Sequence, residues 1–312
     1  MKTVAITGIS GYIGRKLWKL LDKDPEVDKI IGIDVKEPGG TSDKLKFHRM
    51  DINDPALGER FAEEGVDAGV HLAFIVDPIH DSELMRKVNI DGTRNFLAAC
   101  EKAEIKLILA TSSTSAYGAY PDNPVPLHED SPLRGNEDFQ YGREKREMES
   151  ICNKYREEHS GINFIIVRPC IVMGPEVNNY ISQTFLRRGY PLPQDYDPEY
   201  QFVHDEDVAG AMEFLLKNGK GGAYNVTGDG IMKLSEVLEL AGTKPRSISF
   251  RWAYWLAGLL WKLRIAPSDP GIVNYIAYPW VASNEKIVKL GYRFKYNSKE
   301  AFLSFLSAQG RG

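Results

Sequence analysis

The chain has 312 residues, enough for one large domain or two modest ones with a sizeable core. Hydrophobic residues make up 43% of it and charged residues 26%, which is typical of a soluble globular protein. Its net charge of -4 argues against a nucleic-acid-binding protein, because such proteins normally present a basic face.

Apolar β-prone runs alternate with helical patterns through the first half. The run Thr3–Thr7 leads into a glycine-rich turn and then a helical pattern over residues 14–21. Further strands are expected at residues 29–35, 45–50, 70–74 and 106–110, with a long helix over residues 83–102. Because most of these runs lack strict alternation, they suit strands buried on both sides. The pattern predicts an α/β fold with a doubly wound parallel sheet, the Rossmann fold.

The alternation continues with a helix expected over residues 141–159 and a strand over residues 163–168. Prolines then interrupt the chain, and only short strands are expected, at Phe202–His204 and residues 223–227. We therefore expect a nucleotide-binding Rossmann domain over residues 1–170. A smaller mixed substrate-binding region would cover residues 171–312, with parts of 200–230 returning to the first domain.

Residues 252–261, WAYWLAGLLW, carry no charge but are only about half as long as the ~20 residues of a membrane-spanning helix. We expect no membrane span. Because the segment is apolar nearly all round, we expect a buried helix of the second region. An apolar pocket or lid and a membrane-surface contact are the alternatives.

The glycine-rich turn reads Thr7-Gly8-Ile9-Ser10-Gly11-Tyr12-Ile13-Gly14. Glycines let backbone N–H groups approach a pyrophosphate, and the following helix N-terminus adds partial positive charge. Asp34 ends the second strand, where a carboxylate accepts hydrogen bonds from ribose hydroxyls and repels a 2′-phosphate. The pattern predicts NAD rather than NADP. The alternatives are a turn without a ligand and a loop or capping role for Asp34.

Tyr141 and Lys145 share one face of an expected helix. A cation beside a phenol favours the phenolate, as would an oxidised nicotinamide ring. Tyr141 would then exchange a proton with a substrate hydroxyl while hydride moves to or from the cofactor. Hydroxyl residues 111–115 follow a central strand, where open α/β sheets bind ligands, and one of them would polarise the substrate oxygen. The alternatives are a surface Tyr–Lys pair and an ordinary polar turn.

These motifs resemble the extended short-chain dehydrogenase/reductases, also called the NAD-dependent epimerase/dehydratase family. The resemblance covers most of the chain in the family's order. Its segments are TGISGYIG, VHLAF, VNIDGTRNFL, SSTSAYG, YGREK, VRPCIVMGP, FVHDEDVA and AYNVT. It implies an NAD-binding Rossmann domain and an oxidoreductase.

The resemblance also implies residue roles. Tyr141 would be the acid/base, Lys145 would lower its pKa and hold the nicotinamide ribose, and Ser113 would supply the catalytic hydroxyl. Asn89 would support the cofactor or be purely structural. Tyr12 and Ile13 would cover the pyrophosphate, Asp51 and Ile52 would flank the adenine, and the segment after Arg168 would touch the nicotinamide. The implied cofactor-binding set is Gly8, Gly11, Tyr12, Ile13, Gly14, Asp34, Asp51, Ile52, Leu72, Ala73, Phe74, Asn89, Thr111, Tyr141, Lys145, Pro169 and Ile171.

The departures from the family pattern concern the substrate. Ile171 replaces a substrate-holding asparagine of the nucleotide-sugar epimerases, and Tyr200 and Gln201 replace their usual Arg-Asp. Tyrosine lacks the charge and bidentate fork of arginine. Thr114 and Ser115 replace the acid pair of the sugar dehydratases, and Arg187 and Arg188 suit either phosphate contacts or a solvated helix end. We therefore expect an apolar or aromatic secondary alcohol or ketone as the small-molecule substrate.

A nucleotide-sugar 4-epimerase with tightly bound NAD and a non-catalytic NAD-binding regulator are the alternative functions. We expect no metal, because the run His204-Asp205-Glu206-Asp207 has no companion ligands; Asp205 suits a helix cap. The resemblance implies a homodimer formed through the helices of residues 83–102 and 141–159. Three cysteines without metal-ligand spacing and a start that reads as a first strand favour a cytoplasmic protein.

Overall fold

A computed structural model describes residues 1–194 and 196–311 of the chain. Within these residues, a sheet of seven parallel strands has the order β11-β6-β5-β4-β1-β2-β3. The strands are β1 (Thr3–Thr7), β2 (Lys29–Asp34), β3 (Leu45–Arg49), β4 (Ala68–His71), β5 (Leu107–Thr111), β6 (Asn163–Pro169) and β11 (Gly222–Val226). The order runs outward from β1 in both directions, which confirms the doubly wound parallel sheet.

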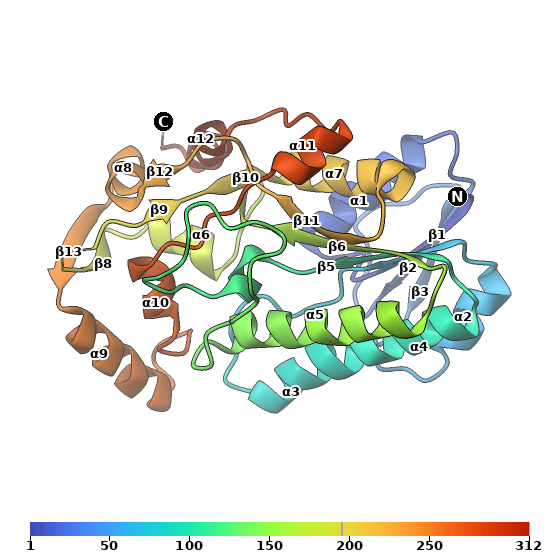
Figure 1. Cartoon of the computed structure of the whole chain (residues 1–312), viewed down its shortest axis with the longest axis horizontal. Coiled ribbons are helices and arrows are strands. Elements are labelled where there is room, and N and C mark those ends of the chain that lie inside the picture. The colour runs from blue at the N-terminus through green and yellow to red at the C-terminus, as the bar shows by residue number, and fades with distance from the viewer. Residues whose placement is uncertain (195, 312) are drawn as a thin grey trace.

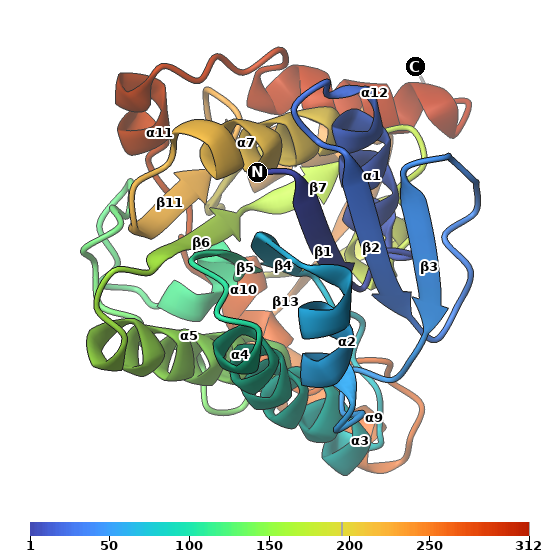
Figure 2. The same cartoon turned by 90° about the vertical axis from the view of Figure 1, so that its right-hand side faces the viewer.

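Helices cover both faces of this sheet (Figure 2). On one face α1 (Tyr12–Lys23) and α7 (Asp205–Asn218) pack together, and on the other lie α2 (Leu57–Glu64), α4 (Gly92–Lys102) and α5 (Gln140–Glu158). Each face has its own apolar core, because the buried strands present side chains on both sides. Packing on both faces holds the strands in place, and the site is built at the ends of these strands.

The helix expected over residues 83–102 is interrupted. It consists of α3 (Ser82–Arg86), a π-helical turn at Lys87–Asp91 and then α4. The turn holds Asn89, which is fully buried, and such π-helical turns are frequent at functional sites. The periodicity indicated the helix, but it contained no signal for the additional residue that a π-helical turn holds.

The remaining chain forms a second region beside the sheet (Figure 1). Its core is aromatic, with Phe185, Phe202 and Phe302 in contact and fully buried. Its strand pairs are β7 (Ile171–Met173) with β10 (Phe202–His204), β8 (Gly189–Pro193) with β13 (Lys244–Ile248), and β9 (Glu199–Tyr200) with β12 (Met232–Lys233). Its helices are α6 (Tyr180–Phe185), α8 (Leu234–Leu240), α9 (Phe250–Lys262), α10 (Ile272–Ala277), α11 (Glu285–Leu290) and α12 (Ser298–Ala308).

Asp205 does not cap α7; its side chain instead links α7 to α1. The N-cap residue is His204, whose side chain accepts from the Glu206 N–H. Asp205 is fully buried, accepts a hydrogen bond from the Tyr12 hydroxyl and pairs with the Lys16 ammonium at 3.1 Å. The expected cap is therefore wrong, because the carboxylate is used to hold α1 against α7.

The helix expected over residues 252–261 is present as α9, but the expectation that it is buried is wrong. Of its residues only Ala253 is buried, and Trp252 and Trp255 are 63% and 57% exposed. None of the helices in the described parts of the chain has both the length and the apolar content needed to cross a bilayer.

Candidate active site

The glycine-rich turn lies between β1 and α1 and passes close to the end of β4. Gly8 has a φ of +72°, and a Cβ there would lie 2.5 Å from the Ala73 nitrogen. A Cβ at Gly14 would lie 2.4 Å from the Gly8 carbonyl oxygen. Both positions therefore require glycine, since any side chain would push the turn away from β4 and α1.

Asp34 lies at the end of β2, beside this turn. Its carboxylate accepts hydrogen bonds from the Ser10 and Lys36 N–H groups, each at 3.0 Å. These bonds fix the carboxylate at the rim of a groove along the sheet edge. Each oxygen keeps a further lone pair for a ligand hydroxyl.

This groove has a volume of about 490 Å³. It brings together eight of the expected cofactor-binding residues: Gly8, Gly11, Asp34, Asp51, Ile52, Leu72, Ala73 and Phe74. Ser10, Met50, Ile75 and Val88 lie in the same wall and were not anticipated. Leu72 to Phe74 belong to the wall because β4 ends at His71, three residues earlier than the sequence suggested.

Tyr12, Ile13 and Gly14 form the first turn of α1 and are not among the residues that line the groove. The Tyr12 side chain points to Asp205, and that of Ile13 packs against the apolar core. Only their backbone N–H groups are thus oriented for a phosphate, as at any helix N-terminus.

The hydrogen bonds of the Asn89 side chain are made to other residues of the protein. Its amide accepts from the Ile75 N–H at 2.6 Å and donates to the Ile75 carbonyl at 3.2 Å and to Glu144 at 2.8 Å. The structural role is the one that this geometry supports. Asn89 ties the chain after β4 to α5, the helix that carries Tyr141.

Tyr141 lies in the first turn of α5, where the groove meets a second cavity. Its ring packs edge-on against Phe74, with centroids 5.9 Å apart. Burial raises the pKa of Tyr141 to about 12, although the Ser113 and Ser115 hydroxyls act in the opposite direction. The phenol is therefore protonated at neutral pH in this structure.

Lys145 is 2% exposed and donates to the Thr111 carbonyl oxygen at 2.7 Å. Its ammonium lies 5.7 Å from the centre of the Tyr141 ring and 3.4 Å from that of Phe74. Burial lowers the pKa of Lys145 to about 7. Burial of the phenol is the largest cause of the Tyr141 pKa shift, and the lowering by Lys145 that the resemblance implies stays a prediction.

The hydroxyl segment after β5 is buried and poorly satisfied. Ser113 is 8% exposed and accepts from the Ser115 N–H, and both serines line the second cavity. Among the described atoms, four buried hydroxyl oxygens of this segment have no hydrogen-bond partner: those of Thr111, Ser112, Thr114 and Ser115. Buried hydroxyls normally find a partner. Of these four residues Ser115 lines the cavity, so its hydroxyl is the one placed to meet a polar group of a ligand.

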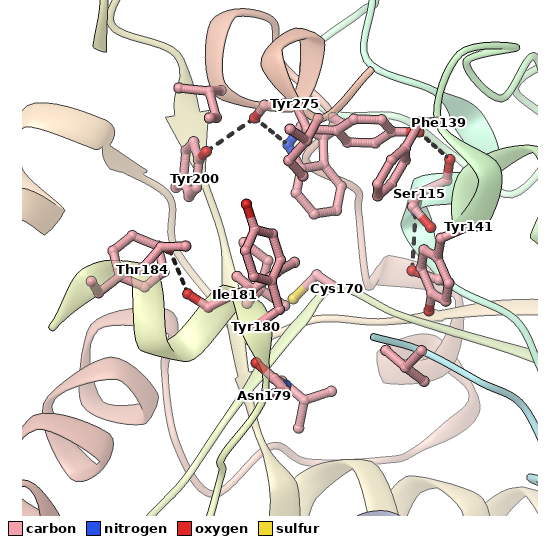
Figure 3. Close-up of a pocket in the computed structure, with 18 of the residues that line it drawn as sticks. Ser115, Phe139, Tyr141, Cys170, Asn179, Tyr180, Ile181, Thr184, Tyr200 and Tyr275 are labelled. Carbon is pink, nitrogen blue, oxygen red and sulfur yellow. Dashed lines mark hydrogen bonds between the residues drawn. The ribbon is translucent and has the colours of Figure 1, made fainter. Parts of the chain in front are cut away.

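The second cavity measures about 180 Å³ and lies beside Tyr141 (Figure 3). In that view Tyr141 and Ser115 lie at one end, Tyr200 and Thr184 at the other, and Tyr180 between them. The wall is mostly aromatic and aliphatic: Phe139, Cys170, Val172, Ile181, Phe185, Tyr190, Ile272, Tyr275, Ile276 and Trp280 also contribute.

The departures from the family pattern fall on this wall. Ile171 and Tyr200 both line the cavity, and the Tyr200 hydroxyl donates to the Tyr275 carbonyl at 3.0 Å. Gln201 instead bonds the backbone of Gly228 and Ala282. Of the residues described in the wall, Arg187 alone carries a charge, and it is exposed. The positions at which the sequence departs from the family pattern are therefore apolar or neutral.

One expected residue, Pro169, lies behind the site. Pro169 ends β6 and pairs with Val226, whereas Cys170 and Ile171 after it reach the cavity. The sequence reading also missed Phe139 and the contact between Tyr275 and the hydroxyl segment. The Tyr275 hydroxyl donates to the Ser115 carbonyl at 2.8 Å across 160 positions of sequence, so no local signal revealed it.

The comparisons with known sequences agree with this geometry. The model of the NAD dependent epimerase/dehydratase family matches residues 4–227. An uncharacterised Mycobacterium tuberculosis protein is 26% identical over 99% of this chain and 84% of its own. The monkeypox virus 3 beta-hydroxysteroid dehydrogenase/Delta 5-->4-isomerase is 36% identical over 49% of this chain and 46% of its own.

Solved structures share the fold at low identity. The Thermus thermophilus UDP-glucose 4-epimerase, in complex with NAD, has a TM-score of 0.76 at 22% identity and covers 99% of this chain and 100% of that one. The Bacillus anthracis dTDP-glucose 4,6-dehydratase, also with NAD, has a TM-score of 0.75 at 18% identity, covering 100% and 97%. Because the family model spans most of the sequence, the chain belongs to the NAD-dependent epimerase/dehydratase family of extended short-chain dehydrogenase/reductases, and its cofactor is NAD, as the sequence predicted.

Proposed function

We propose that the protein is an NAD-dependent oxidoreductase of a secondary alcohol or ketone with apolar or aromatic substituents, with Tyr141 as its acid/base. One observation carries the proposal. Tyr141 lies where a groove suited to a dinucleotide meets a cavity walled by aromatic and aliphatic side chains. Such a cavity excludes water from the reacting carbon and favours an apolar substrate.

The residues of the groove fit NAD. Asp34 would accept from the adenosine ribose, Asp51 and Ile52 would flank the adenine, and the turn from Gly8 would leave room for the pyrophosphate. Phe74 and Lys145 mark the end nearest Tyr141. Bound NAD would accept the hydride when the alcohol is oxidised, and NADH would supply it when the ketone is reduced.

Tyr141 would exchange the proton at the substrate oxygen. Its raised pKa keeps the phenol protonated, which suits donation to a carbonyl oxygen during reduction. The Ser113 hydroxyl would donate a hydrogen bond to the same oxygen. Lys145 would hold the ribose from its position beside Thr111, and its charge would grow in importance when Tyr141 loses its proton.

The 3 beta-hydroxysteroid dehydrogenase of monkeypox virus supports this substrate class, since its name describes oxidation of a secondary alcohol on an apolar ring system. The similarity covers only half of the present chain, so the cavity itself remains the principal argument.

The test is turnover with NAD or NADH and a panel of apolar and aromatic secondary alcohols and ketones, followed at the nicotinamide absorbance. We expect net cofactor turnover with at least one member. An enzyme that cycles hydride without net cofactor change would contradict the proposal.

A nucleotide-sugar 4-epimerase is the second candidate, favoured by the position of Arg187 in the cavity wall and by the structural neighbours. Titration with UDP separates the two, because saturable UDP binding would favour the epimerase. Retention of Ser113, Tyr141 and Lys145 in one place speaks against a non-catalytic NAD-binding regulator.

We further propose that residues 1–170 form the cofactor domain, that the protein is cytoplasmic and that it forms a homodimer through residues 83–102 and 141–159. Its three cysteines are free and buried, as suits a reducing compartment. Analytical ultracentrifugation tests the dimer: a sedimentation coefficient of a monomer at all concentrations would exclude it.

A further inference from the structure

Helix α9 presents an apolar stripe to solvent. Its members are 38% to 67% exposed: Trp252, Trp255, Leu256, Leu259, Leu263 and Ile265. The first five occupy positions i, i+3, i+4, i+7 and i+11 and so lie on one side of the helix. Exposed apolar residues scattered singly need no explanation, but a contiguous stripe with two tryptophans does.

The opposite side of α9 is fixed to the protein. The Tyr254 hydroxyl donates to Asp138, and the Trp261 ring stacks on His80 with centroids 3.9 Å apart. The Ser249 side chain caps the helix by accepting from the Trp252 N–H. The stripe is therefore the outer face of an anchored helix, and α9 lies at the periphery of the second region (Figure 1).

The charged residues within this stretch of sequence have one sign. Residues 240–268 contain five basic side chains and no acidic one, although the whole chain has a net charge of -4. The five are Lys244, Arg246, Arg251, Lys262 and Arg264, and all are exposed. A helix with tryptophans and leucines on its outer face and cations beside them matches the chemistry of an anionic lipid surface.

We propose that α9 docks the protein onto an anionic lipid bilayer, with its apolar stripe entering the headgroup boundary. A second copy of the chain fits this face less well, because a symmetric contact through α9 would bring two basic segments together. The inference does not depend on the proposed reaction. Because α10 contacts α9 and also lines the apolar cavity, docking would place the substrate region beside the lipid.

Co-sedimentation with vesicles tests the proposal. We expect wild-type protein to bind vesicles of equal parts phosphatidylcholine and phosphatidylglycerol about tenfold more tightly than vesicles of phosphatidylcholine alone, and high salt to weaken this binding. Quenching of tryptophan fluorescence by brominated lipid should accompany it, because Trp252 and Trp255 are exposed whereas Trp18 and Trp280 are buried.

Two double variants separate the contributions. Trp252→Glu with Trp255→Glu should abolish binding, and Lys262→Glu with Arg264→Glu should remove the preference for phosphatidylglycerol. The matched control is Lys23→Glu with Lys220→Glu, which alters two exposed lysines near α1 and α7 and should bind as wild type does. NAD binding by each variant verifies that it is folded.

The proposal fails if wild-type protein does not sediment with the anionic vesicles, or if the tryptophan variant sediments equally well. It also fails if wild-type protein is a dimer that the tryptophan variant dissociates, since α9 would then be a contact between copies of this chain.

Discussion

The cofactor groove and the substrate cavity meet at Tyr141, yet they are built differently. The groove is lined by residues between Thr7 and Val88, most of them in turns at the ends of β1, β2 and β4. The cavity is lined by side chains from Val76 to Trp280 and is dominated by aromatic rings. The cofactor site therefore follows from one local supersecondary unit, whereas the substrate site depends on contacts across the whole chain.

The largest expected effect concerns the point where the two sites meet. Tyr141→Phe removes the proton that the substrate oxygen requires, so kcat should fall by about 10³-fold while the NAD dissociation constant stays within a factor of two or so. Steady-state kinetics and NAD titration measure the two quantities. An unchanged kcat would remove Tyr141 from the mechanism.

The next largest effect concerns a buried ion pair between β6 and α5. Arg168, just before the cavity segment, makes a buried pair with Glu149, with Nε–Oε1 and Nη2–Oε2 distances of 2.8 and 2.6 Å. Glu149→Gln leaves a buried guanidinium without its countercharge, so the free energy of unfolding should fall by about 3 kcal/mol in urea titration. A loss below about 0.5 kcal/mol would mean that the pair adds nothing to the fold.

The stability of the region beside the cavity should depend on pH. Asp269, just before α10, accepts from the Gln140 N–H at 2.7 Å, and burial raises its pKa to about 6. Because an unfolded Asp ionises near pH 4, the folded carboxyl costs stability above pH 6 and none well below pH 4. Asp269→Asn should therefore stabilise the protein by about 1–2 kcal/mol at pH 8 and by little at pH 4.

Melting curves at both pH values measure this difference. The control is Asp43→Asn at an exposed position, which should change neither curve. Equal stabilisation by Asp269→Asn at the two pH values would show that ionisation is not the cause.

Two smaller changes would test whether the sites are independent. Ile276→Asn places a polar amide in the apolar wall of the cavity. It should raise the KM for an apolar substrate by about tenfold without changing NAD affinity. If NAD affinity fell equally, the two sites would be coupled through the second region.

Asp34→Asn is the converse change at the groove. Removing the carboxylate charge should reduce the preference for NAD over NADP by about tenfold, and the substrate KM should not change. A preserved preference, measured as the ratio of kcat/KM for the two cofactors, would assign cofactor choice to another residue.

The sequence predicted most of the sheet because parallel strands and amphipathic helices carry local signals. Six of the strands and the helices α1 and α5 lie within a few residues of their expected bounds. The ends of β4 and the π-helical turn at Lys87–Asp91 were missed. The chain that follows β4 is held from outside the strand, because Asn89 bonds the Ile75 backbone and the Gly8 turn packs against Ala73.

The candidate site divides in the same way. Gly8, Asp34 and Ala73 line the groove where the motifs placed them, because a strand, a glycine turn and a helix position one another locally. For Tyr12 the motif indicated the neighbourhood, but its side chain is taken up by Asp205. For Asn89 the sequence left a structural role open, and the bonds to Ile75 and Glu144 support that role.

The parallel sheet, the glycine turn, the Tyr141–Lys145 spacing and the family could all be predicted from local patterns in the sequence. Tertiary structure alone decided that Tyr275 and Tyr200 enclose the cavity, that burial raises the pKa of Tyr141, and that α9 is exposed. The physical reason is that periodicity reports which residues share a face of an element. Whether another part of the chain covers that face depends on packing between residues far apart in the sequence.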